Sequence, residues 1–315
     1  MNSLAEILMK YHDEITKYLY IGYARWDDLI ARIKREEQTS SRDFADEQIW
    51  TFLLACGYAI LGEEGIASLT KILTGSNQKP PANPKIWFEV LPIPPRKGEG
   101  ETHLDLALGT IARRKGTESG IELDDVESPW LCFCEMKWYS DISISVTYDI
   151  NRNQLARVIE NALCFQRSRK YAEKVYVMLV TPSLFCNTPL KSRLYQYKFE
   201  EYNTNRSCLI DDLNACVLEK NDQPDWSFPS DLTHRVMNLS LRWATHDDLF
   251  ENLPNSAIVT ALKNFWIQHG NYQGRAFIAK HGLCGSLRSP KCFALRKARK
   301  RYQQPLKTTT DNETV

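Results

Sequence analysis

The chain has 315 residues, of which 43% are hydrophobic and 25% are charged, and its formal net charge at pH 7 is +1. These proportions are ordinary for a soluble globular protein, and so small a net charge excludes a role carried by the electrostatic field of the whole molecule. No apolar run approaches the roughly 20 residues that a membrane-spanning helix requires, so we expect no membrane contact.

The cysteines and the N-terminal stretch bear on the cellular compartment. The nine cysteines are scattered, and none form a Cys-x-x-Cys pair, so neither a zinc site nor a disulfide framework is expected. The N-terminal stretch MNSLAEILMKYHDE has no basic region followed by an apolar core, unlike a signal peptide. Both observations predict a cytoplasmic protein with reduced thiols.

Helices are expected first along the chain. Apolar residues recur at helical spacing within residues 3–36, which predicts one or two amphipathic helices. Residues 44–61 (FADEQIWTFLLACGYAIL) form the most apolar predicted helix, which should lie against a sheet. Ser41 or Asp43 is expected to cap it. Glu47 lies inside it, either as a buried third acid of a metal site or as an exposed first-turn residue that favours the helix dipole.

Three strands are predicted next. The first, KIWFEVLPIP, carries Glu89, and the second, THLDLALG, carries Asp105. A polar surface loop, residues 111–129, precedes the third strand, WLCFCEMKW, which carries Glu135 and Lys137. Strand glutamates are usually exposed, so Glu89 stays open as a functional or a solvent-facing residue.

The order of elements from residue 43 onward is helix, three strands, helix, strand. An extended segment at residues 138–149 and a helix at 151–172 follow the third strand. Residues 175–183 form a nearly continuous apolar strand, of the kind that is buried on both faces. The remaining expectations are a partly helical stretch at 191–223, a strand at 234–243, a capped helix at 245–253 and a helix at 256–268.

Asp105, Glu135 and Lys137 are predicted to converge at the ends of two apolar strands. Side chains alternate along a strand, so Glu135 and Lys137 project to the same face, and Asp105 lies opposite Leu104 and Leu106. Two carboxylates about 4 Å apart repel by roughly 4 kcal/mol at an effective dielectric near 20. A hard cation such as Mg²⁺ relieves this repulsion and suits a site of few carboxylates completed by water and phosphate oxygens. The alternative is a surface salt bridge between Glu135 and Lys137.

This D…E-x-K pattern, in this order of elements, resembles the PD-(D/E)XK nuclease superfamily. Asp105 matches the first acid of that family, and Glu135-Met136-Lys137 matches its E-x-K. Gln154 is similar to the glutamine on the following helix of the RecB-like branch. The chain contains only one acid-x-Lys triplet, and it falls at the end of a predicted strand.

The resemblance implies an α/β (α+β) fold with a restriction-endonuclease-like core, a mixed central sheet flanked by helices in the order αβββαβ. Leu104 replaces the proline that precedes the first acid in the family. The implied divisions of the chain are a helical N-terminal extension at 1–42, the nuclease core at 43–182, a C-terminal α/β elaboration at 183–285 and a basic tail at 286–315.

The activity implied by the resemblance is hydrolysis of phosphodiester bonds with Mg²⁺, for which Mn²⁺ is the expected substitute. Asp105 and Glu135 would hold the metal, with the backbone carbonyl of Met136 as a further ligand. Lys137 would orient the attacking water and offset the developing negative charge.

Four further residues are candidates for the same site. Glu47 and Glu89 compete for a third acidic role, and Glu47 is preferred because many family members carry a helical acid there. Gln154 and Arg157 lie one turn apart at the polar edge of a helix and would contact phosphate or the lysine. The alternative for both is a solvated helix surface.

The segment 271–310 contains ten Lys or Arg and no acid. Such a run suits contact with nucleic-acid phosphates, and its alternative is a solvated tail. The residues expected to bind nucleic acid are Arg288, Lys291, Arg296, Lys297, Arg299, Lys300 and Arg301.

The expected partner is nucleic acid, with DNA favoured over RNA. The sequence contains no helicase motif, so a nuclease of this kind would act with partner proteins in restriction, phage defence or repair, and a homodimer stays open. The alternatives are a subunit with the same fold that binds nucleic acid without cutting it or has a structural role, and a ribonuclease.

Overall fold

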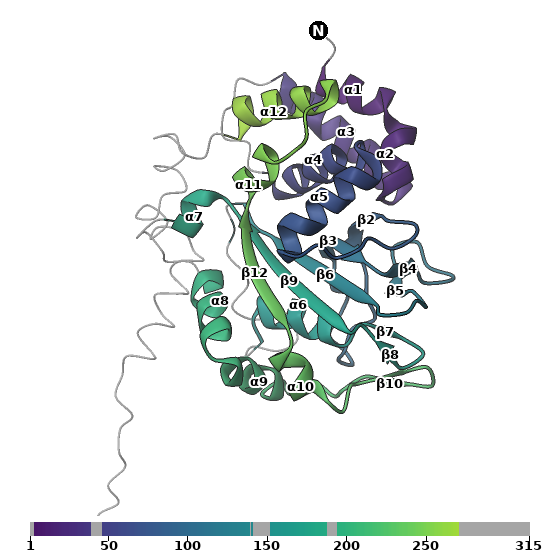
Figure 1. Cartoon of the computed structure of the whole chain (residues 1–315), viewed down its shortest axis with the longest axis vertical. Coiled ribbons are helices and arrows are strands. Elements are labelled where there is room, and N and C mark those ends of the chain that lie inside the picture. Colours follow the sequence, from purple (N-terminus) through teal and green to yellow (C-terminus); the bar gives the residue numbers. More distant parts are fainter. Residues whose placement is uncertain (1–2, 39–45, 139, 141–151, 188–193, 271–315) are drawn as a thin grey trace, which may run out of the picture. The chain divides into compact units, whose positions relative to one another are not determined.

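A six-stranded mixed sheet forms the centre of the fold (Figure 1). The computed structural model describes residues 3–38, 46–138, 140, 152–187 and 194–270. In spatial order the strands are β1 (Leu19–Tyr20), β2 (Ile86–Val90), β3 (Leu104–Gly109), β6 (Trp130–Met136), β9 (Lys174–Thr181) and β12 (Ser240–Thr245). The pairs β2–β3 and β3–β6 are antiparallel, and the other neighbouring pairs are parallel.

The register between β3 and β6 brings two predicted acids together. Leu106 pairs with Cys134, so the next position along each strand places Asp105 opposite Glu135. Residues directly opposite one another in an antiparallel pair project to the same face of the sheet. The predicted convergence of these two carboxylates therefore follows from the strand pairing itself.

Helices cover both faces of the sheet. Phe52 of α4 contacts Phe88 of β2, with ring centroids 5.9 Å apart, on one face. On the other face Phe133 of β6 packs edge-on against Phe165, which follows α6, with ring centroids 5.2 Å apart. A further layer lies over α6. The helices concerned are α4 (Glu47–Ala59) and α5 (Gly62–Thr74) on the first face, α6 (Gln154–Leu163) on the second, and α8 (Leu194–Thr204), α9 (Arg206–Asn214) and α10 (Leu232–Met237) packed against α6 or one another.

An aromatic cluster joins the C-terminal helices to α4. The ring of Trp50 lies 5.2 Å from Trp138 and 5.3 Å from Trp266, centroid to centroid. Phe250 stacks on Trp266 at 4.2 Å. The described residues belong to one compact unit, and residues 272–315 lie outside the described part of the chain. The remaining helices of this unit are α1 (Leu4–Lys10), α2 (His12–Tyr18), α3 (Tyr23–Glu37), α7 (Ser183–Asn187), α11 (His246–Glu251) and α12 (Ala257–His269).

Short polar residues start most of the helices that surround the site. Asp46 caps α4 by accepting a 3.2 Å hydrogen bond from the backbone N–H of Ile49, so the expected cap at Ser41 or Asp43 is wrong. Asn153 caps α6 in the same way. A side-chain oxygen at this position satisfies one of the backbone donors left unpaired in a first helical turn.

The helix expected at 151–172 ends earlier than predicted. It stops at Leu163, and a hairpin of β7 (Gln166–Arg167) and β8 (Lys170–Tyr171) follows. The two turn residues Ser168 and Arg169 have φ values of 49° and 63°. A two-residue hairpin turn needs such left-handed backbone, which Asn-Gly or Asp-Gly would have signalled in the sequence. The turn here is Ser168-Arg169, so the sequence contains neither of these dipeptides.

Two other sequence expectations are corrected. The polar loop at 111–129 contains a hairpin of β4 (Ile111–Arg113) and β5 (Ile121–Leu123) with buried apolar residues. The strand expected at 234–243 begins only at Ser240, because α10 occupies its first half. A last short hairpin joins β10 (Asp222–Gln223) to β11 (Trp226–Ser227).

The expected fold class is confirmed at the level of a mixed α/β protein whose central sheet is flanked by helices. Within the described ranges no helix is both long and apolar enough to cross a membrane. The extended segment expected at 138–149 falls outside these ranges, apart from Trp138 and Ser140, and so does the basic segment from Arg288 to Lys307.

Candidate active site

The two facing carboxylates occupy the adjacent strands β3 and β6. Glu135 is buried, with only 2% of its surface exposed, while Asp105 is half-buried and more accessible. The Asp105 carboxylate accepts a 2.7 Å hydrogen bond from the backbone N–H of Met136. This bond fixes Asp105 against the neighbouring strand. Ligation of a metal by the Met136 carbonyl stays a prediction.

Lys137 supplies the positive charge of this site. It follows the last residue of β6, and its backbone N–H donates to the carbonyl of Val180 over 2.8 Å. Its buried Nζ lies 2.6 Å from Glu135 Oε1 and 3.3 Å from Glu47 Oε1. The Glu135–Lys137 salt bridge that the sequence offered as an alternative is therefore present, but it is buried instead of exposed.

Glu47 belongs to the same cluster, at the first residue of α4. Besides its contact with Lys137, its Oε2 accepts hydrogen bonds from the backbone N–H of Trp138, at 2.7 Å, and from Ser140 Oγ, at 2.8 Å. Glu47 does lie in the first turn, as one alternative had it, but it is half-buried, with 29% of its side chain exposed, and its carboxylate contacts the end of β6.

Glu89 takes a different position. It lines up with Asp105 in the register of β2 and β3, but its φ of 50° interrupts the strand pairing. Its carboxylate lies 2.5 Å from Arg25 Nε and also accepts a hydrogen bond from Gln48. Within the described part of the chain these contacts tie Glu89 to α3 and α4, not to Lys137.

The charges of the cluster perturb one another. Burial raises the pKa of Asp105 well above its ordinary value, and the negative charge of Glu135 raises it further. Burial also raises the pKa of Glu135, although Lys137 opposes this. Burial alone would lower the pKa of Lys137, but the carboxylates of Glu135, Glu47 and Asp105 outweigh it and raise that pKa. Lys137 is thus an ammonium at neutral pH. Its one positive charge does not balance three carboxylates when Asp105, Glu135 and Glu47 are all ionised.

Arg157 lies at the edge of this cluster, and Gln154 begins the same helix. The Arg157 guanidinium donates to the carbonyls of Gly100 and Glu101, at 3.0 and 2.9 Å, in the loop that leads to Asp105. The positive charge of Arg157 also acts to lower the pKa of Glu135, by less than Lys137 does. Gln154 is half-buried, and contact of either side chain with a substrate stays a prediction.

A buried network of charges near α6 was not anticipated from the sequence. Arg152 lies 2.6 Å from Glu99 Oε1 and 2.6 Å from Glu160 Oε2, and all three side chains are fully buried. Arg96 pairs with Glu160 from the other side, again at 2.6 Å. Arg157 reaches Glu99 at 3.5 Å, which links the network to the loop before β3. No spacing or motif in the sequence marks these residues.

His246 was also missed. It is fully buried, and its Nε2 lies 3.3 Å from the backbone carbonyl oxygen of Lys137. In the sequence His246 reads only as part of a capped helix, because its contact with Lys137 spans 109 residues. A contact of this range leaves no local signal.

The carboxylates of Asp105 and Glu135 are the candidate ligands for a metal ion. Among the described residues no three His, Cys, Asp or Glu side chains are arranged as a ready-made metal site. Asp105 and Glu135 nevertheless suit a divalent cation by their chemistry, because two carboxylates lie at facing positions of adjacent strands with one ammonium 2.6 Å from Glu135. Mg²⁺ in proteins is commonly held by one or two carboxylates plus water and phosphate.

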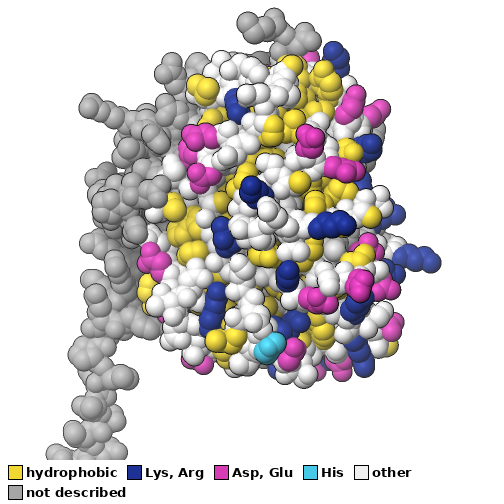
Figure 2. Space-filling view, in the orientation of Figure 1, with side chains coloured by type: hydrophobic (Ala, Val, Ile, Leu, Met, Phe, Trp, Pro, Cys, Tyr) yellow, Lys and Arg dark blue, Asp and Glu magenta, His cyan; other side chains and the backbone are white. Residues whose placement is uncertain are grey.

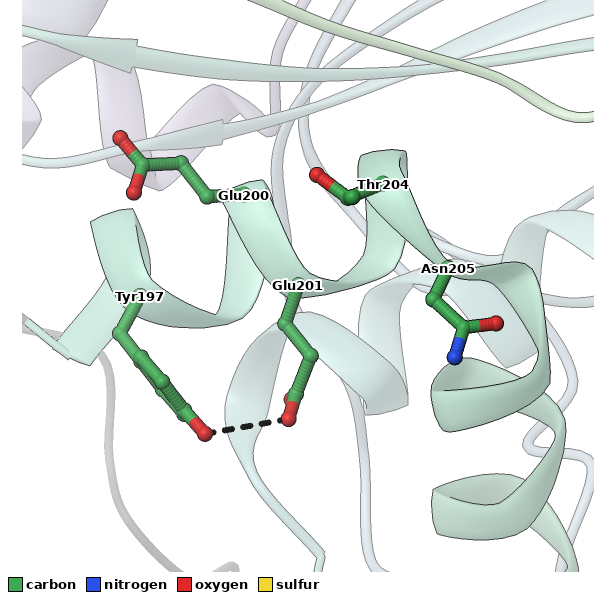
Figure 3. A pocket seen from close by; sticks show the side chains of 5 residues that line it. All are labelled: Tyr197, Glu200, Glu201, Thr204 and Asn205. Carbon is green, nitrogen blue, oxygen red and sulfur yellow. Dashed lines mark hydrogen bonds between the residues drawn. The ribbon is translucent and has the colours of Figure 1, made fainter.

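A hollow on α8 is a separate feature (Figure 3). It is lined by Tyr197, Glu200, Glu201, Thr204 and Asn205. The Tyr197 hydroxyl donates to Glu201 over 3.1 Å at its rim. No predicted site residue lines this hollow, so it does not compete with the carboxylate cluster as the candidate active site.

Comparison with known proteins adds no family assignment: no family model, no curated protein and no solved structure matches the chain.

Proposed function

We propose that the chain is a metal-dependent nuclease of the PD-(D/E)XK type, with Asp105, Glu135 and Lys137 as its catalytic residues. The observation that carries the proposal is the placement of Asp105 directly opposite Glu135, with Lys137 Nζ 2.6 Å from Glu135 at the end of the same strand. The order α4, β2, β3, β6, α6, β9, with β9 parallel to β6, supports a restriction-endonuclease-like core.

The chemistry follows from the charges of these side chains. Asp105 and Glu135 would hold Mg²⁺ or Mn²⁺, and the Met136 carbonyl is the proposed third protein ligand. The bound metal would supply Lewis acidity toward a phosphodiester and lower the pKa of a bound water. Lys137 is positively charged at neutral pH and can hold that water or a phosphate oxygen by hydrogen bonding.

Glu47 would act on the lysine. Its carboxylate lies 3.3 Å from Lys137 Nζ and accepts a 2.7 Å hydrogen bond from the backbone N–H of Trp138. It therefore restricts the movement of both the Lys137 ammonium and the backbone beside it. A third negative charge also keeps Lys137 protonated. We assign Glu47, not Glu89, to the site on these contacts.

The direct test is cleavage of supercoiled plasmid, single-stranded DNA and RNA by the purified protein, with Mg²⁺ or with EDTA. DNA cleavage that needs Mg²⁺ is expected. Asp105→Asn should reduce it by at least about 100-fold, because removing one charge from such a site weakens metal binding and the stabilisation of developing charge. Asn retains an oxygen that can accept the bond from Met136, which protects the fold.

Two further variants refine this test. Lys137→Met should slow cleavage while leaving calorimetric Mn²⁺ binding in place, since it removes no metal ligand. Asp13→Asn is the matched control, because this carboxylate is 97% exposed and lies on α2. Wild-type cleavage by Asp105→Asn would refute the assignment, and absence of any cleavage would favour a module that binds nucleic acid without cutting it.

A further inference from the structure

A buried histidine from outside the predicted core touches the backbone of the candidate catalytic lysine. His246 begins α11, directly after β12 ends at Thr245. Its ring nitrogen Nε2 lies 3.3 Å from the carbonyl oxygen of Lys137. The sequence assigned the nuclease core to residues 43–182, so this contact brings a residue of the C-terminal elaboration to the site.

The contact determines where the proton of His246 lies. Burial lowers the pKa of the ring to about 4, so at neutral pH His246 is uncharged and carries one proton. A carbonyl oxygen can only accept, so the proton lies on Nε2 and is donated to Lys137. The other nitrogen, Nδ1, is buried without a hydrogen-bond partner in the described part of the chain. Among the described residues, the one hydrogen bond of this ring is therefore directed at the backbone of Lys137.

The position of His246 is set by the sheet. Strand β12 pairs in parallel with β9 up to Thr245 and Thr181, and β9 pairs with β6 up to Val180 and Met136. The residue after each strand end therefore lies near the end of β6. Thr245 then begins α11 with a capping box, which fixes the direction in which His246 leaves the strand.

The backbone around Lys137 is held from three elements. Its N–H donates to Val180 of β9 at 2.8 Å, and the following N–H donates to Glu47 of α4 at 2.7 Å. The carbonyl between these two donors is the group that His246 contacts. The ring of Trp138 packs edge-on against the His246 ring at 5.0 Å, which limits its movement.

We propose that His246 is a positioning residue for Lys137: its Nε2–H fixes the carbonyl of Lys137 and thereby the point from which the lysine side chain reaches the reacting groups. This inference rests on the proposed nuclease function for its catalytic consequence. It gives β12 and α11 a part in the active site, because His246 is a positioning residue that lies outside the D…E-x-K pattern.

The test compares variants that keep or remove the donor. His246→Phe retains a planar ring against Trp138 but has no N–H, whereas His246→Gln retains an N–H near the position of Nε2. With Mg²⁺ and a fluorescently labelled DNA duplex, His246→Phe should lower kcat by about 10- to 100-fold with little change in KM, as expected for a small misplacement of a catalytic group. His246→Gln should recover most of the wild-type kcat. His234→Phe on the exposed surface of α10 is the control and should behave as wild type.

A second readout does not depend on activity. Trace acetylation with acetic anhydride, quantified by mass spectrometry, reports how firmly Lys137 is held, with the exposed Lys97 as internal reference. His246→Phe should raise labelling of Lys137 relative to Lys97 several-fold, and His246→Gln should not. If the wild-type protein cleaves no nucleic acid, the proposed function fails, but this labelling still tests the positioning role.

The outcomes separate clearly. Unchanged kcat and unchanged labelling in His246→Phe would overturn the proposal. Equal impairment of His246→Gln and His246→Phe would also overturn it, because the ring and not its N–H would then be what matters. Should His246→Phe fail to fold, His246→Met replaces it as the variant without a donor, and the difference between Met and Gln decides.

Discussion

Three carboxylates and one ammonium meet at the end of β6. Lys137 contacts Glu135 and Glu47 directly, and Asp105 lies opposite Glu135 on the next strand. Removing one partner from a buried ion pair normally destabilises a protein, because it leaves a charge without compensation. For Asp105 we expect little or no such loss, because the charge of Glu135 opposes its ionisation and Lys137 favours it only in part. A surplus of negative charge that the fold tolerates is typical of a site that binds a cation.

The surplus predicts how stability depends on pH and on metal. The folded pKa values of Asp105 and Glu135 lie above their unfolded values. Their contribution to stability is therefore fully present below the unfolded pKa values, about 4, and is lost as the pH rises through the folded ones. A divalent cation bound as proposed would replace the protons at high pH. The rise in melting temperature on adding Mn²⁺ in place of EDTA should accordingly be larger at about pH 8 than at about pH 5. At about pH 8 the added stability should approach about 2.7 kcal/mol when free Mn²⁺ is about a hundredfold above its Kd.

Asp105→Asn separates this metal effect from general salt effects. The variant should lose most of the Mn²⁺-dependent rise, and without metal it should be at least as stable as wild type at about pH 8, because it lacks one repelling charge. Asp13→Asn should keep the full rise. A shift that is equal at both pH values, or one that survives in Asp105→Asn, would contradict a metal site at this carboxylate.

At the scale of elements, strong periodic patterns were predicted correctly and short elements were not. The apolar runs of β3 and β6 were predicted as strands, and their register brings Asp105 and Glu135 opposite one another, as expected. The pairs β4–β5 and β7–β8 have two or three residues per strand, which is too short for any period to be seen. Helix α5 was passed over, although Ile66, Leu69 and Leu73 form its buried stripe.

Contacts between distant residues set the other limit on prediction. The sequence left Glu47 open between a buried acid and an exposed first-turn residue, and only the packing of α4 against the end of β6 shows its half-buried contact with Lys137. His246 and the Arg152 network depend on contacts that bridge many residues of sequence. Local pattern cannot encode such contacts, since each partner alone looks like an ordinary polar residue.

The Arg152 network predicts a large loss of stability from one substitution. Arg152 is fully buried between Glu99 and Glu160, at 2.6 Å from each, and burial already raises the pKa of Glu99. Arg152→Met should reduce the free energy of unfolding by about 3–5 kcal/mol, measured by urea denaturation, because it leaves Glu99 buried without its nearest partner. Adding Glu99→Leu to this variant should restore part of the loss, since the stranded charge is then gone.

A surface ion pair provides the control for this cycle. Arg167 lies 3.5 Å from Glu122, with 47% of its side chain exposed. Arg167→Met should change stability by no more than about 1 kcal/mol. If Arg152→Met costs no more than this control, the network does not hold α6 to the loop before β3.

At the scale of the whole molecule, the described unit is not strongly charged on the side that can be seen. In Figure 2 the Lys and Arg side chains are interspersed with Asp and Glu, and hydrophobic side chains lie between them. The chain as a whole has 40 basic and 39 acidic residues. The proposed nuclease would need positive charge to hold a polyanion, and the sequence concentrates such charge in residues 288–307, where eight Lys or Arg occur without an acid.

This concentration predicts that the C-terminal segment binds the nucleic-acid backbone without reading sequence. Each phosphate neutralised contributes about 0.9 to the slope of log K against log salt on duplex DNA, so four contacts would weaken binding about 150-fold between about 50 and 200 mM salt. Ending the chain after Gly285 should weaken binding equally for unrelated duplexes and flatten the salt dependence, as measured by fluorescence anisotropy. The Mn²⁺-dependent rise in melting temperature should persist, because Asp105 and Glu135 remain. A full-length variant with Arg and Lys at 296–301 changed to Gln should reproduce the loss. A fall in melting temperature with an unchanged salt slope would instead assign the segment to packing on the protein, and unchanged affinity in both variants would exclude the nucleic-acid role.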